Sequence, residues 1–115
     1  MGRSNVPPHS KSPAQDLYDT IRRRYQQFED QARDDQWPAI VCYTPAGETI
    51  RIAEVVLRKG TETLQFRGAD RNNNACDLIS QPQSAQVVVR LIPLTRDTDE
   101  PSRKPIGFRI VEEGE

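Results

Sequence analysis

The sequence predicts an α+β domain in which one N-terminal amphipathic helix packs on a small, strongly bent antiparallel β-barrel of five or six strands. Apolar residues first recur at helical spacing, over residues 12–35. After Trp37 the apolar period changes to two, which is typical of strands. The chain has 115 residues, which is enough for one domain. We therefore expect a single helix-plus-barrel domain over residues 12–111.

Three polar segments fall outside this pattern, and we expect them to be flexible. They are an N-terminal tail over residues 1–11, a loop over residues 95–105 and a C-terminal tail over residues 112–115. The loop is charged and punctuated by proline, and it is long for a compact domain. The ordered core is expected between these segments.

The start of the helix is marked by a capping box. Ser12 can accept a hydrogen bond from the first turn, and Gln15 stands three residues later, so each side chain can satisfy a free N–H. The helix should run to about residue 34 or 35, because Pro38 disfavours helical geometry in the residue before it.

One face of this helix is apolar over three heptads. Its members recur at spacings of three and four residues: Ala14, Tyr18, Ile21, Tyr25, Phe28 and Ala32. Tyrosine and alanine are poor seam residues in a coiled coil, which favours packing on the protein's own sheet. A seam for a partner helix is the alternative.

Six segments read as strands: 39–43, 49–59, 62–68, 76–80, 86–92 and 106–111, the last at an edge. The second is the most informative. Ile50 and Ile52 share one phase, whereas Val55 and Leu57 belong to the opposite phase. A β-bulge between the two pairs would bend the strand and keep all four side chains inward.

The fifth strand follows a tight break at Pro82, which cannot donate to a strand ladder. Three consecutive valines within it indicate burial on both faces. We expect the N-terminal helix to cover the side that carries Val88 and Ile92.

Two stretches, "TPAGETIRIAEVVLRKGTETLQFRG" and "CDLISQPQSAQVVV", give the chain a layout that resembles the Sm-like and SH3-like small barrels. In that family a glycine-containing turn precedes a bent strand, and a short 3₁₀ turn interrupts the final pair. The resemblance covers about residues 12–92. It implies RNA binding in rings for Sm members, and other Sm-like barrels bind and inhibit proteins. The matching RNA-binding positions are Arg67, Arg71, Asn72, Asn73 and Asn74.

The residue types do not indicate a catalytic site or a metal site. The single histidine, His9, lies in the expected tail, where nothing holds it in register. The two cysteines, Cys42 and Cys76, do not approach metal-ligand spacing, and Cys42 reads as a small core residue. We therefore expect no enzyme, no metal and no cofactor.

A net charge of −1 argues against a dedicated nucleic-acid binder. We expect a non-catalytic protein-interaction or regulatory module. Its contact surface would be the edge strand over residues 106–111, the loop before it or the exposed side of the helix, with Phe108, Arg109 and Ile110 as candidate contacts. An Sm-like RNA-binding module is the alternative, and an enzyme subunit completed by another chain is a weaker one. We expect a cytoplasmic, reduced protein that does not bind membranes and could form a homo-oligomer, because no export signal or spanning segment is visible.

Overall fold

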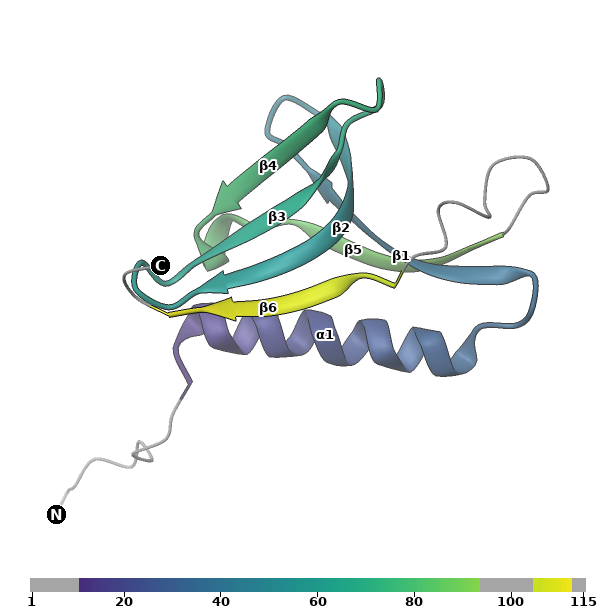
Figure 1. The fold of residues 1–115 in the computed structure, drawn as a ribbon, viewed down its shortest axis with the longest axis horizontal. Coiled ribbons are helices and arrows are strands. Elements are labelled where there is room, and N and C mark those ends of the chain that lie inside the picture. The colour runs from purple at the N-terminus through teal and green to yellow at the C-terminus, as the bar shows by residue number, and fades with distance from the viewer. Residues whose placement is uncertain (1–10, 94–104, 113–115) are drawn as a thin grey trace, which may run out of the picture.

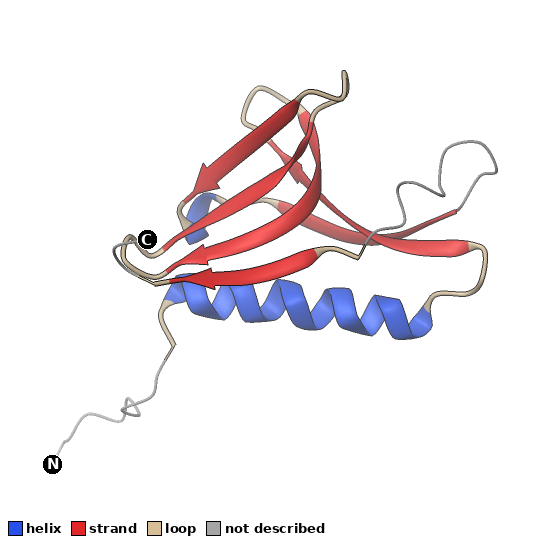
Figure 2. Ribbon diagram, viewed as in Figure 1, coloured by secondary structure: helices blue, strands red, loops and turns tan. Residues whose placement is uncertain are grey.

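The structure, a computed structural model, describes residues 11–93 and 105–112. One helix packs on a six-stranded sheet, which confirms the α+β prediction (Figures 1 and 2). The elements are α1 (Pro13–Gln31), β1 (Gln36–Tyr43), β2 (Thr49–Arg58), β3 (Thr63–Ala69), β4 (Ala75–Ser80), a 3₁₀ turn (Pro82–Ser84), β5 (Val87–Pro93) and β6 (Gly107–Val111). Apart from Lys11, Pro105 and Glu112, the predicted flexible segments 1–11, 95–105 and 112–115 lie outside the described residues.

The sheet is not closed into a barrel, so that part of the prediction was wrong. The strand order is β4-β3-β2-β1-β5, and no pairing joins β4 to β5 within the described part of the chain. The two strands leave the 3₁₀ turn in diverging directions, so their free edges do not meet (Figure 1). The expected antiparallel pairing holds for five strands, but β6 pairs parallel to β2.

The predicted β-bulge in β2 is confirmed. The register with β3 shifts between Ile52, which pairs with Gly68, and Glu54, which pairs with Arg67. Ala53 is therefore the extra residue, and all four predicted side chains are at most 6% exposed: Ile50, Ile52, Val55 and Leu57. A Cβ atom on Gly68 would lie 1.9 Å from the carbonyl oxygen of Arg51, so only glycine allows the two backbones to approach here.

The helix begins as predicted but ends earlier. Ser12 Oγ accepts from the Gln15 N–H at 3.1 Å, but the Gln15 side chain donates to Asp19 and not back to Ser12, so only half of the capping box forms. At the other end, the Ala32 N–H bonds to the carbonyl of Phe28, and Ala32 itself is extended. The helix therefore ends at Gln31 and not near residue 34.

The apolar face of α1 packs on the protein's own sheet. Ala14, Tyr18, Ile21 and Tyr25 are buried there within a single core. The Phe108 ring of β6 lies 5.9 Å from the Tyr18 ring and 5.7 Å from the Tyr25 ring, measured between centroids. The hydroxyl of Tyr25 also accepts the Ile106 N–H at 3.1 Å. We call the side of the sheet that carries this core the inner face, and the opposite side the outer face.

In β5 the helix covers a different face from the one predicted. Val87 and Val89 pack against the core, and side chains alternate along a strand, so Val88 and Ile92 point to the outer face. The prediction that the helix covers the side that carries Val88 and Ile92 was therefore wrong. This leaves apolar surface on the outer face of β5.

Candidate functional site: a cleft at the bend of β2

A cleft of about 770 Å³ opens at the bend of β2. Here β1 and β6, which pair with successive parts of the same edge of β2, separate from each other. Pairing of β1 with β2 ends at Val41↔Arg51, and pairing of β6 with β2 begins at Glu54↔Gly107. Ile52 and Ala53 therefore have no strand beside them on that edge, within the described part of the chain. The bulge thus coincides with a gap on the other edge of β2, and residues from this gap line the cleft.

The wall of the cleft is largely apolar. Trp37 and Ile92 stand opposite each other in the β1–β5 register and both line it, as does Ile106 just before β6. The small, exposed side chain of Ala53, the extra residue of the bulge, also lines the cleft. The small side chain of Ala53 and the half-buried indole of Trp37 leave room for an apolar group from another molecule.

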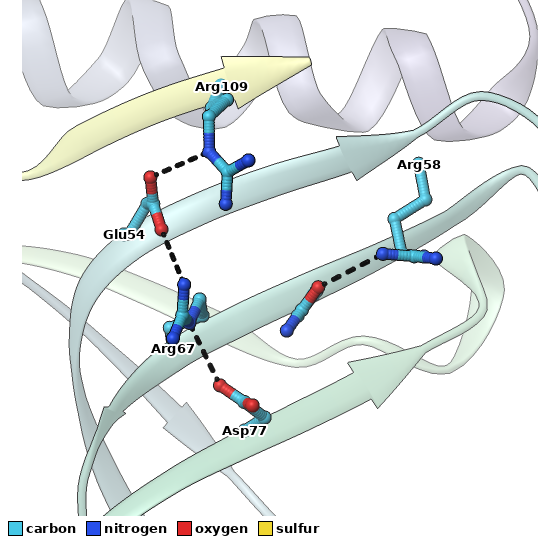
Figure 3. Close-up of polar contacts among 6 residues, drawn as sticks. Glu54, Arg58, Arg67, Asp77 and Arg109 are labelled. Carbon is cyan, nitrogen blue, oxygen red and sulfur yellow. Dashed lines mark hydrogen bonds and ion pairs between the residues drawn. The ribbon is translucent and has the colours of Figure 1, made fainter. Parts of the chain in front are cut away.

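Charged side chains form a row along one side of the cleft (Figure 3). Arg109 Nε lies 3.1 Å from Glu54 Oε2, and a guanidinium nitrogen of Arg67 lies 3.5 Å from the other oxygen of Glu54. Arg67 Nε in turn lies 3.3 Å from Asp77 Oδ1. The row thus crosses β6, β2, β3 and β4, and we call it the ion-pair ladder.

Both carboxylates of the ladder have arginine partners, but the ladder adds little to the free energy of unfolding. Its side chains are partly exposed, and pairs of this kind contribute about 0–1 kcal/mol each. Beside it, Arg58 donates to the Gln65 side chain at 3.4 Å (Figure 3). The ladder therefore forms a polar rim next to an apolar recess.

Arg51 also lines the cleft but does not belong to the ladder. It is exposed and makes no ion pair or hydrogen bond with another described residue. Its register partners are Val41 in β1 and Ala69 in β3, neither of which can bond to a guanidinium through its side chain. The cleft thus contains one arginine without a partner among the residues described.

Neither of the two free thiols is activated as a nucleophile. Cys76 lines the cleft, and its pKa is raised by burial and then by the negative charges of Asp70, Asp77 and Glu48. Burial raises the pKa of Cys42, inside the core, to about 12. Both thiols are therefore protonated at neutral pH. No group of three His, Cys, Asp or Glu side chains that could hold a metal ion occurs in the part of the chain that the structure describes.

Several of the RNA-binding positions implied by the resemblance make contacts within the chain. Arg67 is part of the ion-pair ladder. In the β3–β4 loop, Asp70 Oδ1 accepts the backbone N–H groups of Asn72 and Asn74, both at 2.9 Å. These bonds, led by that of Asn74, hold the pKa of Asp70 below its usual value. Of the three asparagines only Asn73 lines the cleft, and Arg71 does not.

The three candidate contacts of the edge strand do not form one surface. Phe108 packs inward on the helix, whereas Arg109 lies on the outer face in the ladder. Ile110 is 41% exposed. Alternation along β6 therefore separates the residues that the sequence suggested as a contact.

The residues that build the cleft, Trp37, Arg51 and Ala53, were not among the predicted site residues. The phase shift at 52–55 was the available signal, because a bulge interrupts pairing as well as bending the strand. It could have marked this part of β2 as a gap in the sheet. The phase shift did not reveal β6, the strand that pairs with β2 beyond this gap.

Comparison with models of known protein families, with curated proteins and with solved structures finds no match to this chain. Among the described residues, no helix has the length and apolar character needed to cross a membrane.

Proposed function

We propose that this chain is a non-catalytic protein-binding module that accepts an apolar side chain of a partner protein in the cleft at the bend of β2. The observation that carries the proposal is the cleft itself, an apolar recess lined by Trp37 beside a row of paired charges. Its volume falls within the range of about 300–1,000 Å³ that is usual for binding pockets.

The composition of the cleft supports a protein partner. Tryptophan and arginine are enriched among the residues that dominate protein interfaces, and Trp37, Arg51 and Arg67 all line this recess. An apolar centre with a polar rim is also the usual anatomy of such an interface. The order of elements that resembles Sm-like barrels is compatible with this role, since that family includes protein-binding members.

The test fills the cleft without touching the core. Ala53→Phe places a ring in the recess, and Ala46→Phe makes the same change in the exposed β1–β2 turn, outside the cleft. Each variant is used for affinity capture from an extract of cells that produce the protein, with and without nuclease. We expect a protein that the wild type and Ala46→Phe capture equally, that Ala53→Phe loses, and that nuclease treatment leaves in place.

Two outcomes would contradict the proposal. The first is equal capture by all three proteins, because it would place the contact outside the cleft. The second is capture that nuclease abolishes, together with sub-micromolar RNA binding that is lost in Arg67→Ala or Arg71→Ala. This second result would favour the nucleic-acid alternative. Equal free energies of unfolding for the two phenylalanine variants would show that lost binding does not reflect lost folding.

A further inference from the structure

We infer that the partner segment carries an acidic side chain next to its apolar anchor, and that this carboxylate pairs with Arg51. The inference rests on the proposed function, because it specifies the chemistry of the segment that enters the cleft. It assigns Arg51 as the residue that determines specificity.

Two arginines and two carboxylates line the cleft, and Arg51 is the one of these four without an ion pair among the residues described. Arg67 and Arg109 share Glu54, and Arg67 also holds Asp77, so both carboxylates of the ladder already have arginine partners. Arg51 lines the cleft beside them, whereas Arg109 does not line it. A segment that enters the cleft therefore meets one cation that no described carboxylate pairs with.

Arg51 is also placed to contact such a segment. It projects from β2 two residues before Ala53, and both of these residues line the cleft. Side chains alternate along a strand, so Arg51 stands on the same outer face as the exposed Ala53. An apolar side chain over Ala53 thus brings its neighbours in an extended segment close to the guanidinium.

An ion pair with Arg51 should make the cleft bind acidic segments more tightly than basic ones. A guanidinium binds a carboxylate through two parallel hydrogen bonds, which are stronger than hydrogen bonds between neutral groups. A lysine at the same place in the partner would be repelled. A nucleic-acid strand, by contrast, needs several cations acting together along its phosphates, whereas Arg67 and Arg109 are already paired with carboxylates.

The experiment uses three short acetylated peptides that are identical except at the positions beside a central leucine, which carry glutamate, glutamine or lysine. Two signals report on the cleft of the full chain. One is the fluorescence of Trp37, the only tryptophan, and the other is protection of the Cys76 thiol from alkylation. We expect the glutamate peptide to bind at least about tenfold more tightly than the other two, as a hydrogen bond to a charged group implies.

Charge reversal supplies the matched control. Arg51→Glu should abolish the preference for glutamate and favour the lysine peptide. Arg23→Glu makes the same change on the exposed side of α1, away from the cleft, and should leave the order of affinities unchanged.

The outcomes separate this inference from the proposed function. If all three peptides bind equally and Arg51→Glu changes nothing, the cleft is a binding site but the inference about Arg51 is wrong. If none of the peptides alters Trp37 fluorescence or Cys76 protection, the cleft does not accept an apolar segment and the proposed function fails as well. Tighter binding of a single-stranded RNA oligonucleotide than of the glutamate peptide would also overturn the inference.

Discussion

The two faces of β2 differ in what surrounds their side chains, although both belong to the same ten residues. On the inner face, Val55 and Leu57 are completely buried in the core. On the outer face, Arg51 and Ala53 are exposed and line the cleft. The difference indicates that the inner face provides stability, whereas the outer face leaves these two side chains exposed to solvent.

The bulge affects both faces of β2. By adding Ala53 it keeps the apolar side chains inward on both sides of the bend. The same extra residue lies in the part of β2 that neither β1 nor β6 pairs with. The outer face is not uniformly open, since Val56 is buried there, in register between Gln65 and Arg109.

The largest expected effect tests the inner face. Leu57→Ala should lower the free energy of unfolding by about 2–5 kcal/mol, because it leaves a cavity in a packed core. Arg51→Gln, six residues earlier on the outer face, should change it by less than about 0.5 kcal/mol. Denaturant titration of both variants measures the contrast. Similar losses of unfolding free energy in the two variants would contradict the conclusion that the inner face of β2 provides the stability.

The second largest effect is expected at the bulge, where the backbones of β2 and β3 come close together. Gly68→Ala forces a methyl group against the backbone carbonyl of Arg51, which cannot yield as a flexible side chain would. We expect a cost of about 1–3 kcal/mol, as for other overpacked sites. Gly107→Ala is the control, because its Cβ atom would meet only the Glu54 side chain, at 3.6 Å or more. Equal stability of the two variants would show that the bulge does not depend on glycine.

A smaller effect is expected at the start of α1, which covers the inner face. Ser12→Ala removes the acceptor of the Gln15 N–H and should cost about 0.5–2 kcal/mol. Ser12→Asp keeps an acceptor and should restore most of the loss. Thermal unfolding compares the two, and a Ser12→Ala protein as stable as the wild type would mean that the cap is dispensable.

The smallest effect belongs to the ion-pair ladder on the outer face. Arg67→Gln should cost no more than about 1 kcal/mol, and the difference from the wild type should shrink as salt is added. Unfolding at low and high ionic strength measures it. A loss as large as that of Leu57→Ala would show that the outer face also stabilises the fold.

Local patterns predicted the parts of the fold that depend on neighbouring residues. The Ser12 cap, the buried face of α1 and the bulge at Ala53 each follow from spacing over a few positions. Strand alternation also determines which face of β5 meets the core, but the three consecutive valines concealed it. Val88 was therefore assigned to the wrong face.

The long-range features could not be predicted in this way. Whether the sheet closes, and that β6 lies parallel to β2, depends on pairing between segments far apart in the chain. The cleft depends on the same pairing, since it lies where β1 and β6 separate. Trp37 and Arg51 come together only in the folded chain, so neither carried a signal for the site by itself.

The central claim is that the cleft at the bend of β2 contacts a partner protein, and photo-crosslinking tests it most directly. A benzophenone amino acid replaces Ala53 in one protein and Ala46 in another, and both are irradiated in an extract of the producing cells. We predict a covalent adduct with one protein from position 53 and none from position 46. Adducts from position 46 alone, or equal adducts from both positions, would contradict the claim.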